Sequence, residues 1–135
     1  MIERPTVFIC QRITPRSETE NHAMEFLRLI RKGIEVAAEL IYKGFSVYCP
    51  ALDLQYWLSG KYIPTAKDIY EQDISMLLKM DAIFLVGDWS ASPNCCREHE
   101  EAGKANIPCF SQIDVMVNWK RQVWNELHAS GKELK

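Results

Sequence analysis

The chain alternates short apolar runs with longer segments in which apolar residues recur at helical spacing. The first run, 6–10 (TVFIC), is β-branched and aromatic and is typical of a strand buried on both faces. Apolar residues then recur every three or four positions over 23–41, and Gly44 follows as a suitable helix end. The run 45–49 (FSVYC) predicts a second strand. The order strand, helix, strand indicates the crossover unit of a parallel sheet.

The second half repeats this alternation after an irregular segment. Residues 51–66 lack clear periodicity, which predicts a loop with a helical turn over one end of the sheet. Helical spacing resumes at 67, and the apolar run that follows is typical of a central parallel strand. The remaining predictions are a helix over 67–80, a strand over 81–87, turns over 88–94, a helix over 95–105, an edge strand over 108–110 and a helix over 115–128.

This pattern predicts an α/β fold over residues 1–135, as a single domain. We expect a three-layer sandwich with a doubly wound, mostly parallel sheet of four or five strands, of the Rossmann or flavodoxin-like kind. The composition, 47% hydrophobic and 25% charged, is that of an ordinary globular protein and argues against a disordered or low-complexity chain.

Charge and hydropathy exclude two kinds of partner. Sixteen Lys and Arg against 18 Asp and Glu give a net charge of -2, so no positive field exists to hold a phosphodiester backbone. We therefore expect no nucleic acid polymer as partner. No apolar run approaches the roughly 20 residues of a membrane span, and the N-terminus lacks the pattern of a signal peptide. We expect no membrane association and a cytoplasmic location.

The five cysteines indicate neither a disulfide framework nor a metal site. Their number is odd, and no CxxC pair or His/Cys spacing of the zinc-site type occurs. Cys10, Cys49 and Cys109 lie in or beside strand-like runs and are expected to be reduced core residues. Cys95 and Cys96 lie near a helix start, where a thiol can become acidic, but only His99 is an obvious base.

Two carboxylates occupy positions where apolar residues are expected. Asp73 falls on the apolar stripe of the helix over 67–80, and Glu98 falls on a stripe of small residues in the next helix. Ligand sites of parallel sheets lie at the carboxyl ends of the strands, where such helices begin. Because an unpaired buried carboxylate is costly, the two indicate a cleft or a satisfied network. The alternative is that each caps a loop or pairs with an arginine such as Arg12 or Arg16.

Glu98 is expected to be an anion at neutral pH, because it lies about one turn from a helix start at Pro93 or Asn94, where the helix dipole favours the ionised form. An accessible ionised carboxylate is suited to attack an electrophilic carbon or to stabilise an oxocarbenium ion. Asp73, on the opposite wall, is placed to supply or orient a proton.

Several polar residues beside the predicted strand ends are candidates for binding a phosphate. Arg12 and Arg16 follow the first strand, and a guanidinium there can hold a phosphate through two hydrogen bonds or can remain a solvated loop residue. Ser90 and Ser92 lie near a helix N-terminus, where they can donate to the same phosphate or serve only as turn and capping residues.

An aromatic cluster of Tyr56, Trp57 and Tyr62 lies outside the predicted core. Aromatic faces stack on nucleobases, so Trp57 and Tyr62 are candidate binding residues. The alternative is a loop that packs on itself or on a neighbouring subunit. Trp119 and Trp124, in the last helix, are expected to serve helix packing or a subunit contact.

Four sequence blocks, in this order, resemble the nucleoside 2-deoxyribosyltransferase superfamily: VFICQRIT, GFSVYCP, EQDISMLLKMDAIFLVGDW, and SPNCCREHEEA ahead of NIP. The resemblance covers residues 6 to about 110 and is closest to the small branch that contains nucleotide N-glycoside hydrolases. It implies cleavage of the N-glycosidic bond of a nucleoside 5′-monophosphate or nucleoside, by a hydrolase or a deoxyribosyltransferase. It also implies a homodimer or higher homo-oligomer, and a reaction that needs no metal or organic cofactor.

The resemblance assigns roles to particular residues. Glu98 holds the place of the nucleophile that captures the sugar C1′, and Asp73 holds that of an aspartate contacting the leaving base or the sugar. Ser92, six residues before Glu98, corresponds to a serine that touches the 5′-phosphate in the nucleotide-cleaving members. The full set of candidate substrate-binding residues is Phe8, Gln11, Arg12, Arg16, Trp57, Tyr62, Asp88, Ser90 and Ser92.

The chain also departs from the family pattern. Gln11 and Arg12 stand where the family usually has glycine followed by proline or serine, and that glycine lets backbone approach the ligand. Phe8 replaces a common tyrosine, and Asn94 replaces a common glycine. These departures support an alternative, a nucleotide-binding module that kept the fold without catalysis. A third alternative is a subunit-interaction domain with an empty cleft.

Overall fold

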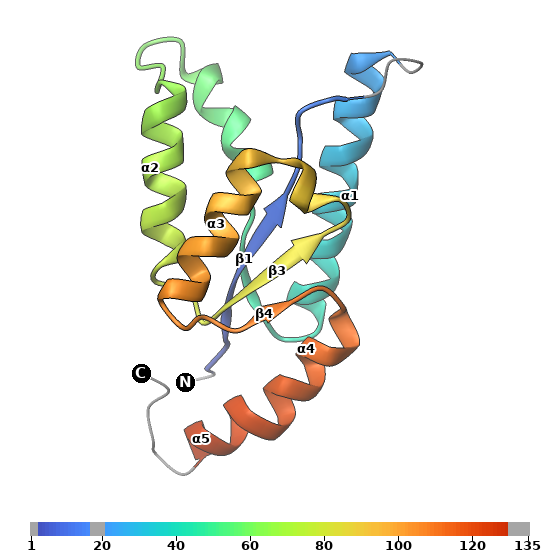
Figure 1. The fold of residues 1–135 in the computed structure, drawn as a ribbon, viewed down its shortest axis with the longest axis vertical. Coiled ribbons are helices and arrows are strands. Elements are labelled where there is room, and N and C mark those ends of the chain that lie inside the picture. The colour runs from blue at the N-terminus through green and yellow to red at the C-terminus, as the bar shows by residue number, and fades with distance from the viewer. Residues whose placement is uncertain (1–2, 17–20, 130–135) are drawn as a thin grey trace.

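In a computed structural model, which describes residues 3–16 and 21–129, four parallel strands form one sheet between two layers of helices (Figure 1). The strands are β1 (Thr6–Gln11), β2 (Ser46–Tyr48), β3 (Ala82–Val86) and β4 (Cys109–Phe110), in the order β2-β1-β3-β4. Register pairs Phe8 with Tyr48 on one side and with Ile83 on the other. The predicted α/β class and parallel sheet are confirmed.

Helices cover both faces of the sheet. Those on one face are α1 (His22–Tyr42) and α4 (Ile113–Trp119), and those on the other are α2 (Ala66–Leu77) and α3 (Pro93–Lys104). Shorter elements are the 3₁₀ helices η1 (Pro50–Ser59) and η2 (Trp89–Ala91), the π-helical segment η3 (Lys120–Trp124) and α5 (Asn125–Ala129). None of the helices in the described part of the chain is both long and apolar enough to cross a membrane.

The core consists of two apolar layers separated by the sheet. Alternate residues of β1 point to opposite faces, so Val7 and Ile9 pack toward α1 and α4, whereas Phe8 and Cys10 pack toward α2 and α3. Every residue of β3 is buried. The apolar runs that predicted these two strands therefore mark the strands buried on both faces.

Local sequence signals define where the helices begin and end. The Asn21 side chain accepts a hydrogen bond of 2.8 Å from the Ala23 amide at the start of α1, and Thr65 forms a capping box with Asp68 at the start of α2. Gly44, with φ of +96°, follows α1 in the conformation that favours glycine.

Three sequence predictions differ from the structure. Residues 50–59 form a 3₁₀ helix, longer than the single helical turn predicted within the loop over 51–66, with Pro50 in its first turn and Gly60 (φ +73°) at its end. The predicted helix over 115–128 begins at Ile113 and is divided by the π-helical segment. Cys109 is exposed rather than buried, because β4 is a two-residue strand at the edge of the sheet. Cys10 and Cys49 are buried, as predicted.

Candidate functional site

A cleft of about 160 Å³ lies at the carboxyl end of β1. Its walls come from the segment after β1, from η1, and from the facing sides of α2 and α3. Pockets that bury a drug-sized ligand usually measure roughly 300–1,000 Å³, so this cleft is sized for part of a ligand with the remainder open to solvent. Three acidic residues line it, namely Asp53 on η1, Asp73 on α2 and Glu98 on α3.

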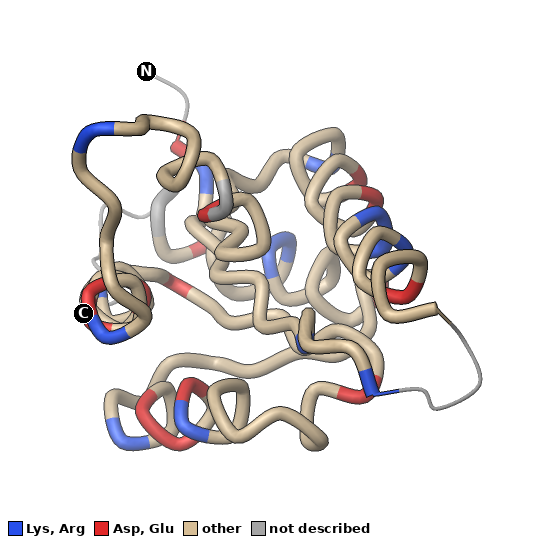
Figure 2. The backbone as a smooth tube through the Cα atoms, turned by 90° about the horizontal axis from the view of Figure 1, so that it is seen from above, with Lys and Arg blue, Asp and Glu red and all other residues tan. Residues whose placement is uncertain are grey.

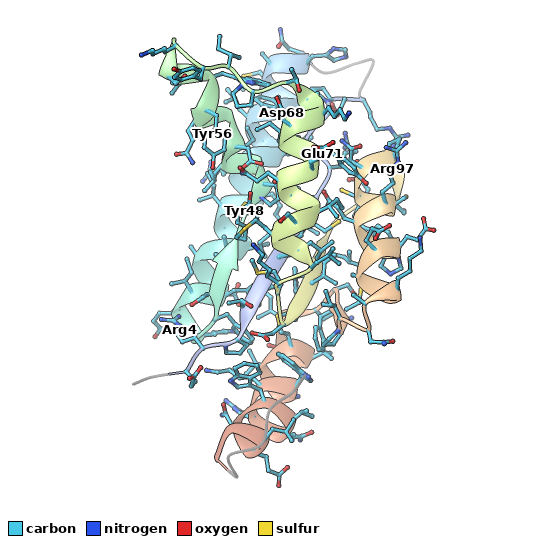
Figure 3. All side chains as sticks on the ribbon, turned by 90° about the vertical axis from the view of Figure 1, so that its left-hand side faces the viewer. Arg4, Tyr48, Tyr56, Asp68, Glu71 and Arg97 are labelled. Atoms are coloured by element: carbon cyan, nitrogen blue, oxygen red, sulfur yellow. The ribbon has the colours of Figure 1, made fainter. Side chains whose placement is uncertain are left out.

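Asp73 is held in the cleft by Tyr48, the last residue of β2. The Tyr48 hydroxyl donates a 3.0 Å hydrogen bond to Oδ1 of Asp73 and accepts one of 3.1 Å from Nε2 of Gln72. The same Gln72 amide lies 3.4 Å from the Tyr56 hydroxyl, and Figure 3 shows both tyrosines beside α2. Ile69, one turn before Asp73, lines the cleft on the same helix face.

Burial raises the pKa of Asp73 to about 8, and the neighbouring Asp53 carboxyl adds to the rise against the opposing effect of Tyr48. Burial likewise raises the pKa of Asp53. Oδ2 of Asp53 is buried and has no hydrogen-bond partner among the described residues. Two carboxyl groups in this arrangement retain a proton at neutral pH, because the free energy needed to ionise both of them side by side is high.

Glu98 is a protonated acid at neutral pH in the unliganded cleft, which contradicts the predicted anion. Its side chain is 7% exposed, and burial raises its pKa to about 8, with a further contribution from Cys95. The helix dipole acts mainly on the first turn, and Glu98 is the sixth residue of α3. Desolvation therefore outweighs the dipole at this position.

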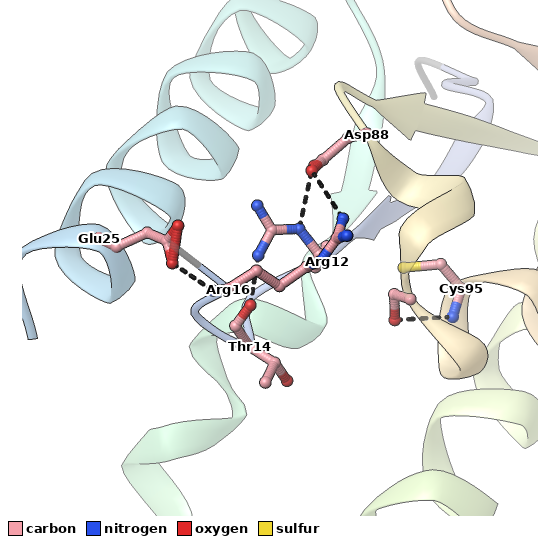
Figure 4. Close-up of polar contacts among 7 residues, drawn as sticks. Arg12, Thr14, Arg16, Glu25, Asp88 and Cys95 are labelled. Carbon is pink, nitrogen blue, oxygen red and sulfur yellow. Dashed lines mark hydrogen bonds and ion pairs between the residues drawn. The ribbon is translucent and has the colours of Figure 1, made fainter. Parts of the chain in front are cut away.

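Arg12 and Arg16 bind Asp88 rather than facing the cleft (Figure 4). Nε of Arg12 lies 3.0 Å from Oδ2 of Asp88, and Nη1 of Arg16 lies 3.9 Å from the same oxygen. The Arg12 hydrogen bond lowers the pKa of Asp88. In residues 3–16 and 21–129 no arginine forms an ion pair with Asp73 or Glu98, so the arginine-pairing alternative for these carboxyls is not observed.

The cleft brings together five of the residues predicted from sequence. Asp73 and Glu98 lie on facing helices, Ser92 and Gln11 line the cleft near the carboxyl end of the sheet, and Trp57 lines it from η1. Ser92 also caps α3, where its hydroxyl accepts a 3.3 Å hydrogen bond from the Cys95 amide. Ser92 can cap α3 and also line the cleft, because the N-terminus of α3 lies at the cleft.

The other predicted binding residues do not line the cleft. Phe8 is fully buried beneath it, with its ring 5.7 Å from that of Tyr48. Ser90 is exposed, and its carbonyl accepts a 3.3 Å hydrogen bond from the Cys96 thiol. Tyr62 is 76% exposed and faces a separate hollow. The remaining members of this group are Arg12, Arg16 and Asp88, in the ion-paired group described above.

Sequence reasoning did not identify Asp53, which lines the cleft, or Tyr48, which holds Asp73 in place. Both follow from a signal that was present, because Tyr48 is the next-to-last residue of the second predicted strand, 45–49, and Asp53 comes shortly after that strand. The carboxyl end of a parallel strand is where ligand sites form, and polar residues there are candidates by position alone.

A buried cluster at the α3 wall of the cleft contains Cys10, Cys95 and Glu98, whose ligand atoms lie within 4.8 Å of one another. Two thiolates and a carboxylate are three of the four ligands that a Zn²⁺ ion takes. The Cys95 hydrogen bond and burial raise the pKa of the Cys10 thiol far above its usual range, so the thiol keeps its proton at neutral pH. A metal ion would have to displace this proton, so the raised pKa of Cys10 weakens metal binding by the cluster.

Comparison of the chain with models of protein families, with curated proteins and with solved structures found no match. What the protein can do chemically must therefore follow from the cleft itself. It combines two buried carboxyl groups on facing helices, a third carboxyl behind one of them, and an aromatic side chain at its wall. Paired carboxyl groups of this kind can carry out acid catalysis and nucleophilic attack on a sugar.

Proposed function

We propose that the protein cleaves the N-glycosidic bond of a nucleoside, with water or a second base as acceptor. The observation that carries this proposal is that Asp73 and Glu98, on different helices, line the same small cleft. Cleavage of an N-glycosidic bond requires a proton for the departing base and a carboxylate that attacks or stabilises the anomeric carbon. In this proposal Asp73, on α2, supplies the proton, and Glu98, on α3, supplies the carboxylate.

Asp73 is the general acid in this mechanism, since a raised pKa keeps it protonated and Tyr48 fixes its orientation. Glu98 first loses its proton to solvent, and its negative charge then raises the pKa of Asp73 further. The Glu98 carboxylate attacks C1′, the C1′–N bond breaks, and the proton of Asp73 moves to the base nitrogen. The result is a glycosyl ester on Glu98 and a neutral free base. Asp73 then takes a proton from water, whose oxygen attacks C1′ and releases Glu98 as a carboxylate.

The charge of the cleft favours a nucleoside over its 5′-monophosphate. Among the described residues that line the cleft, three are acidic and none is lysine or arginine. Arg12, the nearest buried cation to the end of β1, is already paired with Asp88. A phosphate dianion placed beside these carboxyl groups would lack a cationic partner and would disfavour ionisation of Glu98. Of the two substrates that the resemblance implies, we therefore place the nucleoside ahead of its 5′-monophosphate.

Chromatography of free base, released from matched ribo- and deoxyribonucleosides and their 5′-monophosphates, tests the proposal directly. We expect release from at least one nucleoside, with a higher kcat/KM than its 5′-monophosphate. Addition of a second base separates a transferase, which forms a new nucleoside, from a hydrolase. Thermal stabilisation by a nucleoside without release of base would contradict the proposal and support the binding-module alternative.

Trp57→Ala is expected to raise KM about tenfold with little change in kcat, because stacking on a nucleobase contributes roughly 1–3 kcal/mol and Trp57 lines the cleft. The indole is 53% exposed, so its loss leaves the core intact. Tyr62→Ala is the matched control, an exposed aromatic of the same segment that does not line the cleft. Equal effects of the two substitutions on KM would contradict a specific role for Trp57.

A further inference from the structure

The outer face of α1 carries an apolar seam that the rest of the described chain does not cover. Four large side chains on it are between 45% and 60% exposed, namely Met24 (60%), Leu27 (59%), Ile34 (45%) and Ile41 (49%). Together with Arg31 and Ala38, which are also exposed, they occupy positions spaced alternately three and four residues apart over the whole helix. This is the spacing by which one helix packs along another in a coiled coil.

The charged residues beside the seam are divided between the two halves of the helix. Basic residues Arg28 and Lys32, with Arg31 in the seam itself, precede acidic residues Glu35 and Glu39, and midway along α1 in Figure 2 blue positions are followed by red ones. A second copy of the same helix in the opposite direction presents acidic residues to the basic half and basic residues to the acidic half. The pattern is therefore complementary to itself under a two-fold rotation.

The position of Arg31 selects the antiparallel direction. In a parallel, in-register pair, Arg31 would face Arg31 of the second copy inside the seam, where two like charges repel. In the antiparallel pair the facing residues are Met24 with Ile41, Leu27 with Ala38, and Arg31 with Ile34. The Arg31 stem then packs on Ile34 while its guanidinium stays in water, near Glu35 of its own helix at 3.2 Å.

In this antiparallel register the two α1 helices overlap along their full length. The two-fold axis that relates the two copies passes between Lys32 and Gly33, at the centre of α1, so the two seams overlap from end to end. It also places Arg28 beside Glu35 of the second copy, twice per pair. Apolar spacing, charge order and helix length thus agree on one arrangement.

We propose that the protein forms a homodimer through the exposed face of α1, with the two α1 helices packed antiparallel about this axis. The interface buries eight half-exposed large aliphatic side chains, four from each copy. It does not involve the cleft, so the dimer stands or falls independently of the proposed reaction.

Sedimentation velocity over a range of protein concentrations tests the dimer with wild-type protein and the Ile34→Glu variant. The variant puts a carboxylate from each copy into the middle of the seam, and we expect the dissociation constant to rise at least about 30-fold. Leu58→Glu is the matched control, a more exposed apolar residue (86%) on η1 that should leave dimerisation unchanged. A monomeric wild type, or a dimer insensitive to Ile34→Glu, would overturn the proposal.

Charge reversal tests the antiparallel register. Arg28→Glu and Glu35→Arg each place like charges beside each other at the interface, and each should weaken the dimer. The double variant restores opposite charges between the copies and should bind more tightly than either single variant, with thermal unfolding verifying that all three variants fold. Failure of the double variant to recover affinity would exclude this register.

Discussion

Glu98→Gln should lower the rate of base release by at least about 10³-fold while nucleoside binding persists, because a glutamine of the same shape cannot form the glycosyl ester. The substitution replaces a buried group that is uncharged in the resting cleft, so the fold should tolerate it. Base release under saturating nucleoside measures the effect, and thermal shift with the same nucleoside measures binding. Glu100→Gln, an exposed position on the same helix, is the matched control.

A second variant separates a nucleophile from a residue that merely supports the cleft. Glu98→Ala leaves space beside C1′, and azide can enter that space and attack the sugar in place of the carboxylate. We expect azide to restore base release in Glu98→Ala and to produce a glycosyl azide, with no such product from wild type lacking added azide. Full activity of Glu98→Gln, or no rescue of Glu98→Ala alongside intact nucleoside binding, would contradict the role of nucleophile.

The free energy of unfolding should fall as pH rises from about 4 to about 8, opposite to the usual effect of paired carboxylates. The pKa values of Asp73 and Glu98 are both raised to about 8 in the folded protein, whereas the unfolded chain ionises near pH 4. Between these limits the folded state binds more protons, so stability is present below pH 4 and is lost as pH approaches 8. For Glu98 alone the effect is at most about 5 kcal/mol.

Urea unfolding at several pH values measures this slope. Asp73→Asn and Glu98→Gln should each flatten it and be more stable than wild type at pH 8, whereas Glu100→Gln should follow wild type. Asp88, whose pKa is lowered by Arg12, contributes in the opposite direction, with stability that is lost only as pH falls below about 4. A slope over pH 4 to 8 that is unchanged by both cleft substitutions would show that burial does not raise these pKa values.

Much of the architecture could be predicted from sequence because the decisive signals are local. The runs of β1 and β3 are apolar at every buried position, and α1 ends just before Gly44, the predicted helix end. Helical periodicity also placed Asp73 and Glu98 on inward faces correctly. Each of these inferences requires only the geometry of one element and the knowledge that apolar surface is buried.

The electrostatics of the cleft could not be predicted in the same way, because they depend on contacts between distant segments. Asp88 lies 76 residues from Arg12, and Asp73 lies 25 residues from Tyr48. The sequence gives no measure of how completely water is excluded from Glu98, and exclusion of water determines whether its carboxyl group is charged. The helix dipole was visible in the sequence, but the stronger desolvation was not.

The contacts of Asp88 also have a mechanical consequence for exchange of ligand with solvent. The Arg12 and Asp88 pair joins the segment after β1 to the segment after β3, so these two loops share an anchor and should move as one unit. The opposite wall, formed by η1, ends at Gly60 and carries the exposed Trp57. Widening of the cleft would then depend on displacement of η1, which carries the side chain proposed to stack on the base.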